Sequence, residues 1–569
     1  MKLAILLVSV AITPLFGQLS REQMRVDFEQ LAALVAKHYA PYEWKRDALG
    51  HDAMDLRPWL QRVSQAKDDL EFLEICAEYM AALRDLHSGF FVPSDFVAEA
   101  PLFVDYYDGK PLIESIDRSV LPVRLFPVQV GDELIAVDGQ PVAAWVERVS
   151  KLQSFANPSA TRRWALDQIF FRVQAVLPRA HEIGETLRIE VRREATGAVE
   201  TYEVPWDKSG TPVLRIGPTV TPTRSARTHG RSTSLIGRKG DLGETLTVLE
   251  QLRIRRAPAQ KSTRLVGFGS VRPAFNPPQG FVQRLGARGS DVIYSGSYRA
   301  DGLNIGLIRI PNFPSGSAAT AMLRQIDAEV EWMKNNTDGL VLDLMRNPGG
   351  DVCLATDLAA RFIPYRFRAL GDELRPWLEY IRFWRDELDF ATEIGFDNTT
   401  LALLEAIISD LESAYGEVRG RTGPWDICTL SLDREPVRDR DGNASAYHKP
   451  MIVLIDEFST SSGDVLPAML QDANRALMFG KQTAGGGGLS FETYTGFYSE
   501  ATASVSFSLG TRARAVSPAG LPTTNYIENV GVLPDFDVDI MTRENLLTGG
   551  APFVRLFTSA IVDHIRRSR

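Results

Sequence analysis

Cysteine is scarce in this sequence, which has three among 569 residues, Cys76, Cys353 and Cys428. Three scattered cysteines are too few for a disulfide-rich scaffold, and they lack the paired CxxC spacing of a zinc site. At most one disulfide can form. The HExxH zinc-binding pattern is also absent. The sequence therefore predicts no metal centre and no cofactor.

Phosphate-binding features are missing as well. In the segment GKQTAGGGG the glycines follow Lys481, and Gln482 stands where a P-loop has Ser or Thr. The net charge of −9 and the pI near 5.5 provide no attraction for a phosphate backbone. We therefore exclude nucleotides and nucleic acid as partners.

The apolar run at the N-terminus, MKLAILLVSVAITPLFGQLS, is shorter than the roughly 20 residues that span a bilayer. Lys2 precedes this run, and the small Gly17 precedes a polar segment, as in a signal peptide. A membrane anchor and a buried strand are the alternatives. We predict a signal peptide over residues 1–17, no stable membrane anchor, and a secreted or periplasmic protein.

The remaining composition is that of a folded protein, with 44% hydrophobic and 24% charged residues. The chain is too long for one core, so several domains are expected. We predict an N-terminal helical region (18–100), a β-rich domain (101–207), an insertion expected to be regulatory (208–300) and an α/β domain (301–569) with a helical insertion at about 367–445.

Two patterns suggest the type of the larger domains. The order LNIGLIRI, ATAMLRQIDAEVEWMKNN, GLVLDL alternates strand, helix and strand, which predicts an α/β layer. The segment VGDELIAVDGQPV (130–142) resembles a PDZ domain, in which a Gly-Asp turn leads into a strand and an Asp-Gly hairpin. PDZ domains bind extended peptides at a sheet edge.

The segment IDEFSTSSGDVLPAML (455–470) places Ser461 where an apolar strand turns into a helix, with Asp464 three residues later. One interpretation is a capping box, in which the serine hydroxyl bonds the free amides of the first turn. The other is a nucleophile, because a helix N-terminus also presents amides to a developing oxyanion. Ser461 alone does not distinguish the two.

A second segment, DLMRNPGGD (343–351), follows the strand GLVL. Gly349 and Gly350 would let backbone amides approach a bound carbonyl, as in an oxyanion hole. A plain strand-to-helix turn is the alternative.

These two segments, followed by QDANRALMFGKQTAGGGG (471–488), resemble the motifs of the C-terminal processing, or tail-specific, serine peptidases in the same order. The resemblance implies a crotonase-like catalytic α/β domain, protein or peptide substrates, and a homodimer. In the Ser-Lys branch of that family, the catalytic lysine stands at the position of Gly486. Lys481 lines up with a non-catalytic position, so another base is needed.

The Ser-His-Glu branch supplies that base. His87 in ALRDLHSGF and Glu528 in YIENVGVLP resemble its histidine and glutamate motifs. The resemblance implies that His87 takes the proton of Ser461 and that Glu528 orients the imidazole. It also implies an oxyanion hole formed by the amide of Ser462 and that of Gly349 or Gly350. Histidine suits the role because its unperturbed pKa lies near neutrality.

Each partner also has an ordinary interpretation: His87 as a helix C-cap, and Glu528 as a surface carboxylate. The sequence predicts a secreted serine endopeptidase. The alternatives are a catalytically inactive peptide-binding protein with the same fold, which the missing lysine suggests, and a Ser-Lys peptidase that uses Lys481.

Overall fold

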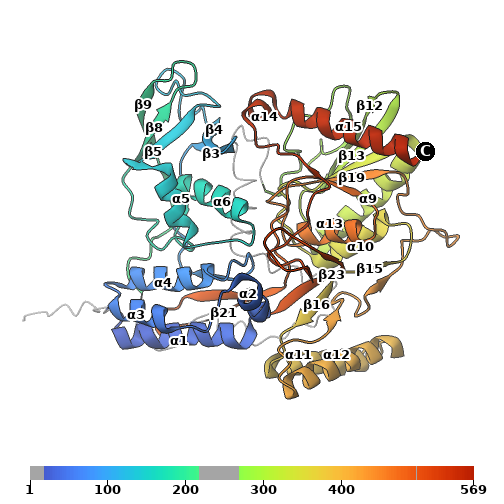
Figure 1. The fold of residues 1–569 in the computed structure, drawn as a ribbon, viewed down its shortest axis with the longest axis horizontal. Coiled ribbons are helices and arrows are strands. Elements are labelled where there is room, and N and C mark those ends of the chain that lie inside the picture. Colours follow the sequence, from blue (N-terminus) through green and yellow to red (C-terminus); the bar gives the residue numbers. More distant parts are fainter. Residues whose placement is uncertain (1–17, 217–267, 495) are drawn as a thin grey trace, which may run out of the picture.

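The structure, a computed structural model, describes residues 18–216, 268–494 and 496–569. The predicted signal peptide (1–17) and residues 217–267 of the predicted insertion lie outside the described residues. Figure 1 shows the N-terminal helices and the PDZ-like unit on one side and the large α/β unit on the other. Within the described ranges, no helix is both long and apolar enough to cross a membrane.

Four helices form the N-terminal region: α1 (Arg21–His38), α2 (Tyr42–Leu49), α3 (Arg57–Gln65) and α4 (Asp69–Ala81). Helix α1 begins at a capping box, in which the Ser20 hydroxyl accepts from the Gln23 amide and the Gln23 side chain accepts from the Ser20 amide. Its apolar stripe, which includes Phe28 and Leu31, is buried against α4.

A small sheet joins this region to the C-terminal part of the chain. It consists of β1 (Gly89–Phe91), β22 (Thr502–Ser506) and β21 (Ser490–Tyr494) in that order. Alanine and valine side chains of β22 pack into the core of the N-terminal helices. In Figure 1 the orange strand β21 accordingly lies among the blue helices. The N-terminal region is thus built partly from residues near the other end of the sequence.

The PDZ-like unit has a sheet in the order β3-β4-β5-β8-β9, with the short β6 paired to β5. Burial alternates along β8, with Leu187, Ile189 and Val191 facing the core. Helices α5 and α6 cover this face. The strands are β3 (Leu102–Tyr107), β4 (Lys110–Ile116), β5 (Glu133–Val137), β6 (Gln140–Pro141), β8 (Thr186–Arg192) and β9 (Val199–Pro205), and the helices are α5 (Val142–Ser150) and α6 (Pro158–Phe170).

Beside this unit runs a second small sheet, in the order β10-β2-β7. Its strands are β2 (Val97–Glu99), β7 (Phe171–Val173) and β10 (Asp207–Ser209).

The large unit is built on a seven-stranded sheet in the order β11-β12-β13-β14-β19-β20-β25. The strands from β13 to β25 are parallel, and β11 and β12 form an antiparallel edge. The bounds are β11 (Val282–Leu285), β12 (Tyr294–Ala300), β13 (Leu303–Arg309), β14 (Gly339–Asp343), β19 (Met451–Ile455), β20 (Leu477–Gly480) and β25 (Phe536–Asp537).

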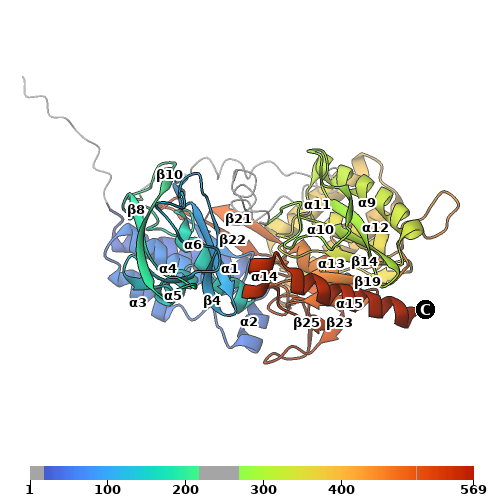
Figure 2. The same cartoon turned by 90° about the horizontal axis from the view of Figure 1, so that it is seen from above.

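Helices cover both faces of this sheet, so its strands are apolar on both sides. Helices α9 (Gly316–Asn336), α10 (Val352–Phe362) and α13 (Ser462–Asp472) pack on one face, where Leu340 and Leu342 of β14 point. Helix α15 (Ala551–Ser568), preceded by α14 (Arg543–Thr548), packs on the other, where Val341 points. Figure 2 shows α15 crossing the sheet. The predicted α/β class is confirmed.

The strands β11 and β12 lie within the range 208–300 that the sequence analysis assigned to an insertion. They are part of the main sheet, since β12 pairs with β13 along its whole length. This range has little helical or strand periodicity, which is why the sequence did not reveal its last two strands.

The predicted helical insertion contains an antiparallel helix pair, α11 (Leu378–Glu393) and α12 (Asn398–Gly416). A disulfide between Cys353 and Cys428 ties the start of α10 to the segment after this pair. Cys76 is buried and unpaired. The surrounding strands are β15 (Phe367–Arg368), β16 (Gly371–Leu374), β17 (Pro424–Trp425), β18 (Asp433–Arg434), β23 (Ser508–Val516) and β24 (Thr524–Tyr526).

Candidate active site

Ser461 lies at the turn where β19 leads into α13, and its φ is 57°, a left-handed value that is unusual for a residue with a side chain. Its hydroxyl makes no capping bond to the first turn of α13. The helix-cap interpretation is therefore wrong. Instead, Ser461 Oγ lies 3.0 Å from His87 Nε2. Strained backbone of this kind is often found at functional sites.

His87 is buried between the N-terminal helices and the C-terminal strands. Helix α4 ends at Ala81, so His87 does not cap it. The His87 amide donates to Asp85 Oδ1 at 2.8 Å, and its carbonyl accepts from the Ser504 hydroxyl on β22. Its Nδ1 is buried and has no hydrogen-bond partner among the described residues. These two bonds hold the backbone of His87 in place, and the ring presents Nε2 to Ser461.

Glu528 is 1% exposed, so it is not a surface carboxylate. Its Oε1 accepts from Lys45 Nζ at 2.5 Å, and its Oε2 accepts from the Gly487 amide at 3.2 Å. Burial, and then the charge of Asp85, raise the pKa of Glu528 to about 8, while Lys45 acts in the opposite direction. The polar partners of Glu528 are therefore Lys45 and the glycine-rich loop, and not the His87 ring directly.

The glycine-rich loop lies between His87 and Glu528. A Cβ on Gly486 would be 3.2 Å from His87 Cε1 and 2.9 Å from the Leu86 side chain, and a Cβ on Gly487 would be 2.9 Å from the Glu528 amide nitrogen. A long side chain at Gly486, where the Ser-Lys branch has its lysine, would thus crowd the histidine. Asp464 of α13 holds this loop by accepting from the amides of Gly485 and Gly486.

Lys481 lies elsewhere. Its Nζ is 2.6 Å from Asp537 Oδ1, and its side chain is 37% exposed. Burial would lower its pKa, but the bond and charge of Asp537 outweigh this effect and raise it above the ordinary value. A general base needs a lysine pKa shifted down toward neutrality, so this environment opposes such a role.

Three amides were candidates for the oxyanion hole. The Gly349 amide donates to Asn347 Oδ1 at 2.8 Å within its own turn, so it is already engaged. The amides of Gly350 and Ser462 have no such partner among the described residues, and the Ser462 hydroxyl donates to the Gly350 carbonyl at 2.7 Å. Gly350 and Ser462, unlike Gly349, also line the small cavity beside Ser461 and His87.

Gly349 nevertheless has a clear steric requirement. Its φ is 90°, and a Cβ there would lie 2.5 Å from Ser461 Cβ and 2.7 Å from the Thr460 carbonyl. Only glycine allows the two loops to approach this closely.

A small cavity of about 40 Å³ opens beside Ser461 and His87. Apolar side chains of Val352, Leu370 and Leu489 line it, together with Asp372. Burial raises the pKa of Asp372 to about 7, opposed by a hydrogen bond from Ser508. The cavity can hold a small side chain next to the reacting atoms.

Sequence reasoning missed Lys45, Asp464 and Asn347 as supporting residues. Lys45 carries no sequence signal, since a lysine in a short amphipathic helix is ordinarily a surface residue. Asp464 was noticed only as half of a capping box. Within the described ranges, no group of three or more His, Cys, Asp or Glu side chains could hold a metal ion.

Comparison with known families agrees with this architecture. Residues 304–538 match the model of peptidase family S41, and residues 97–213 match the model of the PDZ domain. A protein of Chlamydia pneumoniae is 23% identical over 577 residues, covering 92% of this chain and 88% of that protein. A protein of Chlamydia trachomatis is 24% identical, covering 91% and 89%.

Among solved structures, mature CPAF in complex with lactacystin superposes with a TM-score of 0.72 and 20% identity, covering 96% of this chain and 99% of that one. A second structure of mature CPAF gives a TM-score of 0.72 and 19% identity, covering 96% and 98%. CPAF is the chlamydial protease-like activity factor. The sequence motifs predict a likeness to this protein, and the superposition confirms that likeness. The chain is thus a peptidase with the CPAF fold, whose residues 304–538 match the model of peptidase family S41 and whose residues 97–213 match that of the PDZ domain.

Proposed function

We propose that this peptidase is a secreted or periplasmic serine endopeptidase that uses Ser461 as nucleophile, His87 as general base and Glu528 as the supporting carboxylate. The observation that carries the proposal is the 3.0 Å separation of Ser461 Oγ and His87 Nε2. It brings together two residues that are 374 positions apart in the sequence. This distance lies within the hydrogen-bond reach that a general base requires.

In the proposed mechanism, Ser461 Oγ attacks the carbonyl carbon of the scissile peptide bond while His87 Nε2 takes the hydroxyl proton. The amides of Ser462 and Gly350 donate to the developing oxyanion. The tetrahedral intermediate then collapses: the carbon–nitrogen bond breaks, and His87 gives its proton to the departing amine. Water, deprotonated by His87, hydrolyses the resulting acyl-enzyme and restores Ser461.

Glu528 would stabilise the imidazolium that forms in each half of the reaction. The burial of His87 Nδ1 without a partner among the described residues supports a need for a nearby acceptor. Glu528 would meet this need directly or through one water molecule, as catalytic contacts often tighten when substrate binds. Only the ionised form can stabilise the imidazolium, so the pKa of Glu528 becomes a determinant of rate.

The PDZ domain would hold an extended part of the substrate, since such domains bind peptides by strand addition. Two contacts support its coupling to the site. Asn157 donates to the Thr483 carbonyl at 3.1 Å, beside the glycine-rich loop, and Arg163 pairs with Glu457 at 3.1 Å in the loop before Ser461. The small cavity beside Ser461 favours a small side chain next to the scissile bond.

A fluorophosphonate probe tests the proposal, because it labels an activated serine and spares an inert one. We expect labelling of the purified protein, mapped by peptide analysis to Ser461 and lost in His87→Ala. The alternative, a peptide-binding protein without activity, predicts no labelling while peptide binding persists.

A further inference from the structure

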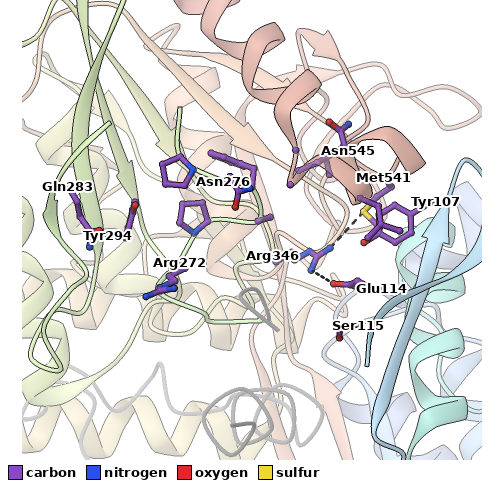
Figure 3. Close-up of a pocket in the computed structure, with 18 residues that line it drawn as sticks. Tyr107, Glu114, Ser115, Arg272, Asn276, Gln283, Tyr294, Arg346, Met541 and Asn545 are labelled. Carbon is purple, nitrogen blue, oxygen red and sulfur yellow. Dashed lines mark hydrogen bonds and ion pairs between the residues drawn. The ribbon is translucent and has the colours of Figure 1, made fainter. Parts of the chain in front are cut away.

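A larger cavity, of about 400 Å³, lies between the PDZ domain and the peptidase domain, away from Ser461 (Figure 3). The PDZ strands β3 and β4 supply one wall through Tyr107, Glu114 and Ser115. Residues 272–277, β11, β12 and residues 540–550 supply the other walls. Its volume is within the range of cavities that bind small ligands, and such sites are common at domain interfaces.

Arg346 lines this cavity and is only 7% exposed. A guanidinium carries five N–H donors. Of these, Nη2 donates to the Met541 sulfur at 3.8 Å, Nη1 lies 3.8 Å from Glu114 Oε1, and Nε has no partner among the described residues. A buried cation is ordinarily held by close, charge-assisted hydrogen bonds. These contacts therefore leave part of the hydrogen-bonding capacity of the Arg346 guanidinium unused.

Two further features favour an anionic acceptor. Like Arg346 Nε, the Ser115 hydroxyl is buried without a hydrogen-bond partner among the described residues. Ser115 lies on the wall that the PDZ strands supply. Arg272 is exposed on the opposite side of the cavity, as Figure 3 shows. Among the described lining residues, Arg272 and Arg346 stand beside one carboxylate, Glu114, so this part of the lining carries an excess of positive charge.

The remaining lining suits a peptide. The aromatic rings of Tyr107, Tyr294 and Phe275 offer flat apolar contacts, and the side-chain amides of Asn276 and Asn545 can pair with peptide groups. We propose that this cavity binds a short peptide through a carboxylate, which Arg346 and Arg272 recognise. The carboxylate is either the free C-terminus of the peptide or an acidic side chain. Recognition here rests on side chains and differs from strand addition at a sheet edge.

The test measures peptide affinity by calorimetry on the full chain carrying Ser461→Ala, so that no peptide is consumed. Three tripeptides serve as probes: a neutral amide ending in glutamine, the same amide ending in glutamate, and a tripeptide with a free C-terminal carboxylate. We expect at least one carboxylate peptide to bind about 10-fold more tightly than the neutral peptide, a difference of about 1.4 kcal/mol. Which of them binds identifies the source of the carboxylate.

Variants locate the binding site. Arg346→Gln should abolish the preference for a carboxylate, and Arg272→Gln should weaken it. Arg57→Gln is the matched control, because it removes the same charge from a side chain that is 92% exposed and is not among the lining residues. If Arg346→Gln fails to fold, Arg272→Gln alone decides. Equal affinity for all three peptides, or a preference that survives in the folded arginine variants, overturns the proposal.

Discussion

Replacing Lys45 by methionine should move the pH dependence of catalysis, because Lys45 is the counter-charge of Glu528. The two groups are 2.5 Å apart, and each side chain is 1% exposed. The pKa of Glu528 is raised to about 8 even with Lys45 present. Since the proposed mechanism needs the carboxylate, wild-type kcat/KM should rise as pH increases through about 8.

The size of the effect follows from the charge that is lost. An opposite charge at contact distance lowers a carboxyl pKa by about 1–3 units, so Lys45→Met should raise the pKa of Glu528 by about that amount. At pH 7 the ionised fraction then falls by about 10-fold to 1,000-fold, and kcat/KM falls with it. At alkaline pH the variant should recover toward wild-type activity.

The assay is kcat/KM for a fluorogenic peptide between about pH 6 and 10, with circular dichroism at each pH to verify the fold. Lys45→Arg is the control that keeps the charge, and its profile should stay close to that of the wild type. A loss of the same size at every pH would mean that Lys45 only supports the fold. An unshifted profile in folded Lys45→Met would refute the link between Glu528 ionisation and catalysis.

Further predictions concern the reacting groups and their neighbours. Ser461→Ala should lower peptide hydrolysis by about 10⁶-fold with little change in the melting temperature, since its hydroxyl makes no capping bond; residual full activity would exclude it as nucleophile. His87→Ala should lose a similar factor while Lys481→Ala keeps most activity in the same assay, and the reverse pattern in folded proteins would indicate a Ser-Lys mechanism. Gly349→Ala should be inactive or unfolded by thermal melt, because its Cβ would lie 2.5 Å from Ser461 Cβ. For Glu528, the folded pKa of about 8 exceeds the ordinary 4.5, so its contribution to stability is present below pH 4.5 and is lost as pH rises toward 8; wild type should lose denaturant stability relative to Glu528→Gln across that window.

The main elements of the fold could be predicted because their signals are local. The strand before Ser461 and the helix after it follow from an apolar run and helical spacing, and the PDZ-like hairpin follows from its Gly-Asp and Asp-Gly turns. The pairing of Lys45 with Glu528 could not be predicted in this way, because it joins groups 483 residues apart. This ion pair forms only through tertiary packing, and a local sequence pattern contains no information about such packing.

The oxyanion candidates show the same limit at shorter range. Gly349 and Gly350 look equivalent in the sequence, and the structure separates them, since the Gly349 amide donates to Asn347 while Gly350 lines the cavity beside Ser461. Likewise, the edge strand β11 is exposed over most of its length, and β12, although mostly buried, consists largely of tyrosine, serine and glycine, so neither strand shows an aliphatic run in the sequence.

The pairing of β1 with β22 has a consequence for biosynthesis. His87 directly precedes β1, and β1 acquires its partner only when residues 502–504 are available to pair with it. During translation, a growing chain that already contains His87 and even Ser461 would therefore still lack the strand that fixes the imidazole. Under the proposed mechanism, proteolytic activity would therefore arise only after nearly the whole polypeptide has been made.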